Sequence, residues 1–169
     1  MMKKKAIVFS YNSLKTKKVA EKIVEAFGDN ELESVNAETI SGDVFLQFEK
    51  LILGVPTWFD GELPNYWDEF VPELEELDLT GKTFAIFGLG DQKGYPENFG
   101  DAIGLLGRLI QNRGGKLTGF TSTEGYFFEA SRALDGDRFM GLLIDQENQA
   151  RLTGSRVSDW VKDLKMNGF

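Results

Sequence analysis

The residues Thr83-Phe84-Ala85-Ile86-Phe87 lead directly into the loop Gly88-Leu89-Gly90-Asp91-Gln92-Lys93-Gly94-Tyr95. A short apolar run that ends in a glycine-rich loop is typical of a buried parallel strand and the loop at its carboxyl end. A second short apolar run occurs earlier in the chain, where residues 51–55 precede Pro56-Thr57-Trp58. In an open α/β sheet, ligands bind in the crevice outside the carboxyl ends of the strands. The two loops therefore predict a site that contains two aromatic rings and one carboxylate.

The side chains of these loops indicate the class of ligand. Trp58 and Tyr95 offer two flat aromatic faces, and Asp91 offers a hydrogen-bond acceptor near them. Aromatic faces stack on flat ring systems, and a carboxylate accepts hydrogen bonds from an N–H edge. A flat heteroaromatic ligand with an N–H edge fits this set, which points to a flavin.

Around these loops, strand and helix patterns alternate, which predicts an α/β fold with a doubly wound parallel sheet. Strands are expected at 6–9, 33–35, 51–55 and 83–87 and from near 116, and helices around 19–27, at 66–77, at 98–112 and around 157–164. Residues 121–148 show no clear crossover helix, so we expect an insertion there that splits the fifth strand. Residues 1–169 are expected to form one domain that includes this insertion.

Composition limits the chemistry. The chain has no cysteine and no histidine, which excludes disulfides, thiol redox chemistry, a histidine general base and most transition-metal sites. The demanding chemistry is therefore expected to belong to a cofactor. A net charge of −8 disfavours nucleic acid and anionic membranes and favours a basic protein partner. Because the apolar run 6–9 is too short for a signal peptide and no run is long enough to span a membrane, we expect a cytoplasmic protein.

Several motifs together give a resemblance that covers nearly the whole chain. They are Pro56-Thr57-Trp58, Gly61-Glu62-Leu63, Gly88-x-Gly90-Asp91-Gln92-x-Gly94-Tyr95, Asn98-Phe99, Glu124-Gly125-Tyr126, Gly141 and Asp145-x-x-Asn148-Gln149. With these residues the chain resembles a long-chain flavodoxin. Val19, Asn12, Lys15 and Glu62-Leu63-Pro64 resemble most the flavodoxins associated with nitrogen fixation. The resemblance implies a flavodoxin-like five-stranded parallel sheet of order 2-1-3-4-5, bound FMN and service as a one-electron carrier rather than an enzyme.

The resemblance and the charge together imply the partners. They would be basic redox proteins such as a ferredoxin/flavodoxin–NADP reductase or a nitrogenase reductase, which a monomeric carrier would meet in turn. Full reduction tends to leave an anionic flavin, and Asp60, Glu62 and Asp91 would disfavour that charge. We therefore expect a low-potential carrier.

The family pattern assigns roles to the residues of the two loops. Trp58 and Tyr95 would sandwich the isoalloxazine ring, and Asp91 would accept a hydrogen bond from the flavin N3–H. Phe59-Asp60-Gly61 lies where a peptide turns toward the flavin N5 and stabilises the neutral semiquinone, although flavodoxins often have Asn-x-Gly or Gly-x-Gly there. The remaining cofactor-binding residues expected from these loops are Pro56, Thr57, Gly88, Leu89, Gly90 and Asn98.

The loop between the first strand and the first helix departs from the family pattern Thr/Ser-x-Thr-Gly-x-Thr, which holds the FMN phosphate. This chain reads Tyr11-Asn12-Ser13-Leu14-Lys15-Thr16, preceded by Ser10. Tyr11 replaces a short hydroxyl side chain, and Leu14 replaces the glycine. In one account, Leu14 points outward and the loop keeps its N–H groups for the phosphate, with Ser10, Asn12, Ser13, Lys15 and Thr16 as further donors. In the other account, the loop has lost its phosphate affinity.

Two alternative functions follow from other readings of the same residues. An FMN-dependent NAD(P)H:quinone reductase would use the same cofactor as an enzyme, but Trp58 and Tyr95 would obstruct the face on which its substrates bind. A flavin-free binding module on the same scaffold is suggested by Tyr11 and Leu14 alone.

Overall fold

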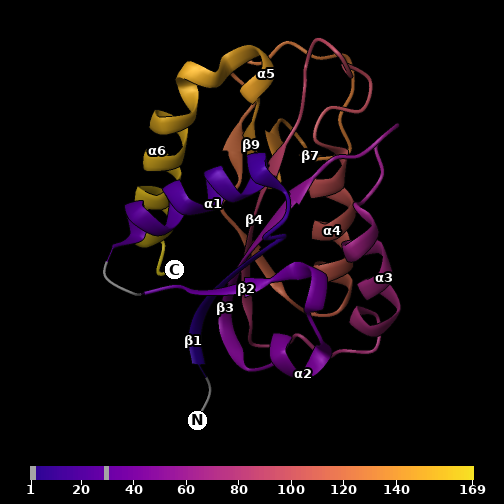
Figure 1. Cartoon of the computed structure of the whole chain (residues 1–169), viewed down its shortest axis with the longest axis vertical. Coiled ribbons are helices and arrows are strands. Elements are labelled where there is room, and N and C mark those ends of the chain that lie inside the picture. The colour runs from indigo at the N-terminus through magenta and orange to yellow at the C-terminus, as the bar shows by residue number, and fades with distance from the viewer. Residues whose placement is uncertain (1–2, 29–30) are drawn as a thin grey trace.

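The computed structural model describes residues 3–28 and 31–169 and has a parallel sheet at its centre (Figure 1). The strand order is β2-β1-β3-β4-β5, and β9 also pairs with β4. This confirms the predicted fold class and the order 2-1-3-4-5. The strands of this sheet are β1 (Lys3–Phe9), β2 (Glu33–Asn36), β3 (Phe48–Pro56), β4 (Thr83–Leu89), β5 (Lys116–Thr118) and β9 (Leu142–Ile144).

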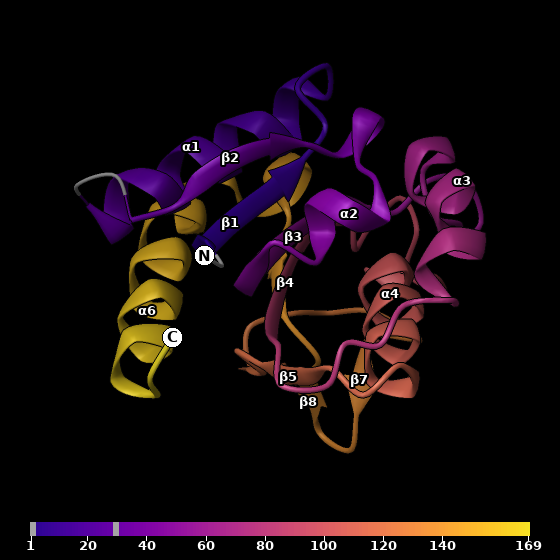
Figure 2. The ribbon, with the colours of Figure 1, turned by 90° about the horizontal axis from the view of Figure 1, so that it is seen from below.

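Helices cover both faces of the sheet. Helices α1 (Leu14–Phe27) and α6 (Thr153–Met166) pack together on one face, and α3 (Asn65–Leu74) and α4 (Asp101–Asn112) cover the other (Figure 2). In the ranges that the structure describes, no helix is long and apolar enough to cross a membrane.

The core consists of two hydrophobic clusters, one on each face. Ile23 of α1 and Trp160 of α6 belong to the cluster that contains Ile52 of β3. Trp67 of α3 belongs to the other cluster, together with Phe84 of β4. Because β3 and β4 are buried from both sides, nearly all of their residues are apolar rather than alternating with polar ones.

Strands β3 and β4 hold the two predicted loops beside each other. Their parallel pairing runs from Lys50↔Thr83 to Pro56↔Leu89. One residue further, the Thr57 N–H donates to the Leu89 carbonyl oxygen at 3.3 Å. Both strands therefore end at the same height, and the loops that follow them leave the sheet side by side.

The fifth strand is split, as the sequence predicted. β5 pairs with residues 83–85 of β4, and β9 pairs with residues 87–89 of the same strand. The intervening residues 119–141 contain a small antiparallel sheet of β6 (Thr121–Ser122), β8 (Arg138–Phe139) and β7 (Leu134–Asp135). The expected range of 121–148 was too long at its carboxyl end, because the buried residues Leu142–Ile144 return to the main sheet as β9.

Helix ends and short elements differ from the prediction. α3 ends at Leu74 rather than at 77, because the chain then tightens into turns in which the Leu77 N–H donates to the Leu74 carbonyl oxygen. α4 begins at Asp101 rather than at 98, because Gly100 before it has a left-handed backbone with φ of 66°. The short elements η1 (Ala37–Thr39), α2 (Gly42–Phe45), α5 (Gln146–Gln149) and η2 (Ala150–Leu152) were not predicted.

Candidate functional site

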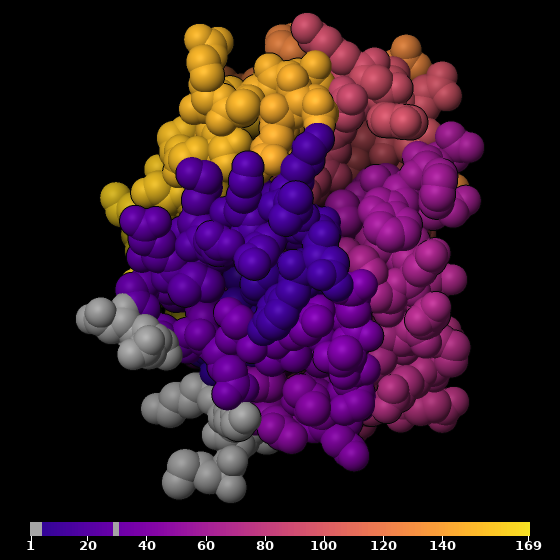
Figure 3. Space-filling model, viewed as in Figure 1, coloured from indigo at the N-terminus to yellow at the C-terminus, as the bar shows by residue number. Residues whose placement is uncertain are grey.

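A cavity of about 500 Å³ lies at the carboxyl ends of β3 and β4. On the surface, the first loop, the 90–95 loop and the segment around α5 meet on one face of the molecule (Figure 3). The cavity brings together most of the residues that the sequence predicted. Its lining consists of Ser13, Leu14, Lys15, Pro56, Thr57, Trp58, Phe59, Leu89, Gly90, Asp91, Tyr95, Asn98, Gln146 and Glu147.

Trp58 and Tyr95 both face this cavity, but they are held differently. The backbone of Trp58 exchanges two hydrogen bonds with Glu62, at 2.9 and 2.7 Å, and its half-buried ring packs edge-on against Tyr66 with 6.1 Å between centroids. The Tyr95 N–H donates to the Asp91 carbonyl oxygen at 2.8 Å, while the Tyr95 side chain is 53% exposed. Neither ring is withdrawn into the hydrophobic core, so both have a face available to a ligand.

The residues 59–61 form the tip of a tight hairpin between the bridged residues Trp58 and Glu62. Phe59 has a left-handed backbone with φ of 48°, which is unusual for a bulky residue, and its side chain is 70% exposed at the cavity. Gly61 has φ of 92°, and a Cβ atom there would lie 2.5 Å from a carboxylate oxygen of Asp101. Glycine is therefore required at Gly61, whereas Phe59 carries backbone strain.

Asp60 and Gly61 do not line the cavity. Both lie instead at a second cavity of about 570 Å³ between α3 and α4. The hairpin explains this placement, because it turns the chain away from the first cavity after Phe59. Gly88 is also outside the cavity, since it is buried within β4, where a Cβ atom would lie 2.7 Å from the Ile103 side chain.

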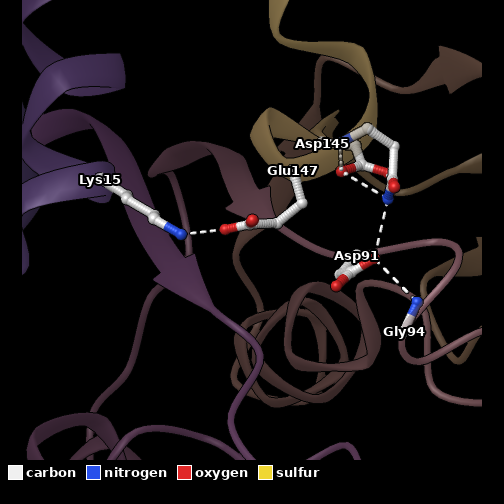
Figure 4. A network of polar contacts seen from close by, with 6 residues as sticks. Lys15, Asp91, Gly94, Asp145 and Glu147 are labelled. Atoms are coloured by element: carbon white, nitrogen blue, oxygen red, sulfur yellow. Dashed lines mark hydrogen bonds and ion pairs between the residues drawn. The ribbon is translucent and has the colours of Figure 1, made fainter.

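Asp91 is held by a network of hydrogen bonds (Figure 4). Its Oδ1 atom accepts from the Gly94 N–H at 2.8 Å, from the Lys93 N–H at 3.2 Å and from the Asn148 side-chain amide at 2.7 Å. The Gly94 hydrogen bond lowers the pKa of Asp91 against the opposing effect of partial burial, with further contributions from Asn148, Lys93 and the charge of Lys15. Oδ1 thus accepts all three hydrogen bonds, and among the described residues Oδ2 has no hydrogen-bond donor.

The same network connects the 90–95 loop with the inserted segment. The fully buried carboxylate of Asp145 accepts from the backbone N–H of Gln92 at 3.1 Å and from its side-chain amide at 2.7 Å. The Asn148 side-chain amide donates to both Asp145 and Asp91. The side-chain oxygen Oε1 of Gln92 in turn accepts from the Phe127 N–H at 2.7 Å. The cavity wall is therefore fixed by Asp145, which directly follows β9, by Asn148 of α5 and by the insertion.

The first loop delivers the N-terminus of α1 to the cavity. Ser13 precedes the helix in an extended conformation, and its side chain does not cap the helix. Leu14 is the first helical residue and is 71% exposed at the cavity mouth, so the position that carries glycine in the family pattern needs no left-handed backbone here. In the described part of the chain, the N–H groups of residues 14–16 have no hydrogen-bond acceptor. This end of the helix therefore offers free donors and the positive end of its dipole.

Four residues of the first loop lie outside the cavity. The Ser10 hydroxyl is buried and donates to Glu38, and the exposed Asn12 side chain donates to the same carboxylate. The Tyr11 ring packs against Phe9 at 5.1 Å between centroids. Thr16 is fully buried and accepts a hydrogen bond from Ser13. None of these four residues therefore lines the cavity that Ser13 and Lys15 line.

Two lining residues were missed by the sequence prediction. Gln146 and Glu147 begin α5, directly after Asp145, and Glu147 forms an ion pair with Lys15 across the cavity edge (Figure 4). The motif Asp145-x-x-Asn148-Gln149 marks this segment in the sequence. Nothing local shows that it reaches the first loop, because Lys15 and Glu147 are 132 residues apart.

Thr57 and Asn98 line the cavity but are also structural. The Thr57 hydroxyl accepts from the Ala102 N–H at 3.1 Å and so satisfies a free donor of α4. The Asn98 side-chain amide donates to Asp101 at 3.3 Å. Both hydrogen bonds fasten the start of α4 against the cavity floor.

The cavity, the two rings and the free helix N-terminus can be set beside known proteins. The family model described as Flavodoxin matches residues 7–160 of the chain. The chain belongs to the flavodoxin family. Flavodoxins of Nostoc sp. and Klebsiella pneumoniae align with it nearly end to end. The first is 41% identical over 98% of this chain and 97% of its own length, and the second is 40% identical over 94% and 95%.

Solved flavodoxin structures agree with the same fold. The crystal structure of Fusobacterium nucleatum flavodoxin bound to flavin mononucleotide has a TM-score of 0.91 and 33% sequence identity. The alignment covers 98% of this chain and 99% of that flavodoxin. The cavity described above therefore belongs to a scaffold on which a relative binds FMN.

Proposed function

We propose that this flavodoxin binds FMN in the 500 Å³ cavity and carries single electrons between redox proteins. The observation that carries the proposal is the combination of Trp58 and Tyr95 at one cavity with the free N-terminus of α1. Family membership and the FMN-bound relative support it. Such a cavity would accept a ligand with a flat ring system, which the two aromatic side chains would contact, and a phosphate group, which the helix N-terminus would bind.

Different residues would bind the ring and the phosphate of FMN, at opposite ends of the cavity. Trp58 and Tyr95 would pack against the two faces of the isoalloxazine ring and exclude water from it. The N–H groups of residues 14–16, with Ser13 and Lys15, would hold the phosphate. Lys15 can serve there if its ammonium group turns from Glu147, with which it pairs at the exposed cavity edge.

The 90–95 loop would hold the edge of the ring. Asp91 Oδ2 would accept from the flavin N3–H, while the Gly94 N–H, which lowers the pKa of this carboxyl, holds Oδ1. A Cβ atom at Gly94 would lie 2.5 Å from Asp91 Oδ2, so glycine is required for this arrangement. FMN, when bound, supplies the one-electron chemistry that a chain without cysteine or histidine lacks.

The charge of the protein would set the direction of electron flow. Asp91 and Glu147 line the cavity, and Asp60 and Glu62 lie next to it. Each carboxylate near the ring would oppose the gain of negative charge by about 1 kcal/mol or less in water-like surroundings, which is equivalent to tens of millivolts. We therefore infer a low-potential donor. The net charge of −8 would steer it toward basic partners such as a ferredoxin/flavodoxin–NADP reductase or a nitrogenase reductase. The monomeric state and the cytoplasmic location stay predictions.

Titration of the FMN-free protein with FMN, followed by flavin fluorescence, tests the proposal. We expect saturation at one FMN per chain, and we expect Trp58→Ala and Tyr95→Ala each to weaken binding by about tenfold or more. Phe127→Ala is the matched control, because Phe127 is 80% exposed and does not line the cavity. Loss of affinity in all three variants alike, or in none, contradicts the assignment of the rings.

A reductive titration of the FMN-loaded protein tests the carrier role. We expect two resolved one-electron potentials, and electron transfer to a basic reductase that slows as salt is added. Rapid oxidation of NAD(P)H by the protein alone in the presence of a quinone would instead support the quinone reductase alternative. Failure to bind FMN at all would support the flavin-free module.

A further inference from the structure

Glu38, which does not line the cavity, is hydrogen-bonded to the first loop. Glu38 lies in η1, directly after β2, and its side chain is exposed. Its Oε2 atom accepts from the Ser10 hydroxyl at 2.9 Å and from the Asn12 side-chain amide at 2.7 Å. One carboxylate oxygen therefore holds two side chains of the loop from a segment that is 26 to 28 residues away.

The backbone of the loop is fixed by the same group of residues. The Ser10 hydroxyl, while donating to Glu38, accepts from the Asn12 N–H at 3.2 Å. The Tyr11 N–H donates to the Asn36 side-chain oxygen at 3.3 Å, and that oxygen also accepts from the Glu38 N–H at 3.1 Å. The pairing of Phe9 with Asn36 at the end of β1 and β2 brings the two segments together.

These contacts bear on whether the first loop can still bind a phosphate without the glycine of the family pattern. The loop lacks the glycine of the family pattern, and two of its expected phosphate donors, Ser10 and Asn12, are bonded to Glu38 instead. Within the described residues, Ser13 and Lys15 are the only polar residues of this loop that line the cavity. The loop must therefore present its backbone N–H groups in a fixed direction, and Glu38 supplies the acceptor that holds the side chains of Ser10 and Asn12 shortly before them.

We propose that Glu38 is a positioning residue for the phosphate end of the flavin site, which it orients through Ser10 and Asn12 so that the N–H groups of residues 14–16 face the cavity. The inference rests on the proposed binding of FMN. The proposal predicts that Glu38 strengthens FMN binding, whereas its charge alone would weaken it. A carboxylate near a phosphate disfavours binding by repulsion, whereas a carboxylate that orders the phosphate loop favours binding by removing the ordering cost from the binding step.

Binding of FMN and of riboflavin to Glu38→Ala and Glu38→Gln tests the proposal. Riboflavin carries the same ring system without the phosphate, so only FMN should respond to the order of the first loop. We expect Glu38→Ala to weaken FMN binding by about tenfold and to leave riboflavin binding within about twofold of the wild type. Glu38→Gln keeps an oxygen that can accept from both partners, and we expect it to restore most of the FMN affinity.

Three further measurements separate positioning from a general effect on the fold. Glu25→Ala removes the same charge from the exposed side of α1, far from the loop, and should change neither affinity. Asn12→Ala should weaken the binding of FMN but not of riboflavin. The double variant Asn12→Ala/Glu38→Ala should lose less FMN affinity than the sum of the two single losses, because each substitution removes the same hydrogen bond. The ³¹P resonance of bound FMN should shift in Glu38→Ala and not in Glu25→Ala.

The contrary outcomes are distinct from a failure of the proposed function. Unchanged or tighter FMN binding by Glu38→Ala overturns the proposal, since charge alone would then account for Glu38. Equal weakening of FMN and riboflavin overturns it as well, because the effect would then reach the whole site. Glu38→Gln that binds FMN as weakly as Glu38→Ala also overturns it. A wild-type protein that binds neither flavin would refute the proposed function itself.

Discussion

Asp145→Asn is expected to destabilise the protein strongly, because it removes one of the two accepting oxygens of a buried carboxylate. That carboxylate is hydrogen-bonded both to the 90–95 loop and to α5. Asp145 is fully buried and accepts from four N–H groups, namely the backbone and the side-chain amide of both Gln92 and Asn148. Asparagine keeps one accepting oxygen and replaces the other with a donor. Whichever way its amide turns, one set of donors faces an NH₂ group.

The magnitude follows from the number of donors that lose their acceptor. A buried donor without a partner costs about 1–3 kcal/mol, and at least one backbone N–H and part of one amide are affected. We expect the free energy of unfolding of the FMN-free protein to fall by about 3 kcal/mol. For a domain of this size the melting temperature should then fall by roughly 6–12 °C. This is a large share of a typical stability of about 5–15 kcal/mol.

Urea unfolding followed by circular dichroism measures the effect, with Asp137→Asn as the matched control. Asp137 is exposed in the inserted segment, so its substitution makes the same charge change without a buried acceptor. Because Asn148 also holds Asp91, we further expect Asp145→Asn to weaken FMN binding, as seen by fluorescence titration. An unfolding free energy within about 0.5 kcal/mol of the control would refute the reasoning, since the four hydrogen bonds would then not be supporting the loop.

Two further predictions concern titration and a buried hydroxyl. The Gly94 N–H lowers the pKa of Asp91 in the folded protein below its unfolded value of 3.8. The charged Asp91 therefore contributes its full stabilisation at pH values above 3.8, and this stabilisation is lost as the pH falls through the folded-state pKa. The stability gap between the wild type and Asp91→Ala should therefore be constant near neutral pH and narrow below about pH 4 in urea titrations; a gap that stays constant at low pH contradicts this. The Thr153 hydroxyl is buried and has no hydrogen-bond partner in the described part of the chain. Thr153→Val should therefore raise the unfolding free energy by about 1 kcal/mol in calorimetry or urea unfolding, and a loss of stability would show that the hydroxyl is satisfied in solution.

The elements that sequence patterns predicted well are those with a strong local signal. The largely apolar residues 51–55 and 83–87, each followed by a loop, predicted buried strands, and they make up most of β3 and β4. The helical spacing of Val19, Ile23 and Phe27 likewise placed α1 against the sheet. Short elements such as η1 and α2 have little local signal, because three or four residues do not complete a periodic pattern.

The candidate site divides in the same way. Trp58 lies two residues after the end of β3 and Tyr95 six residues after the end of β4, so their common location follows from the pairing of these parallel strands. The roles of Ser10 and Asn12 could not be predicted, because both are set by Glu38 across a gap of 26 to 28 residues. Glu147 was missed for the same reason, since its partner Lys15 lies near the other end of the chain.

The amino-acid sequence by itself determined the alternating strands and helices, the two aromatic loops and the absence of thiol or imidazole chemistry. These depend on composition and on patterns within a few residues. Only the tertiary structure decided which donors of the first loop remain free, which atom of Asp91 is committed to its turn and which residues of α5 close the cavity. The physical reason is that a hydrogen bond needs its two groups within about 3 Å, and for groups far apart in the chain that distance is set by the packing of the whole fold.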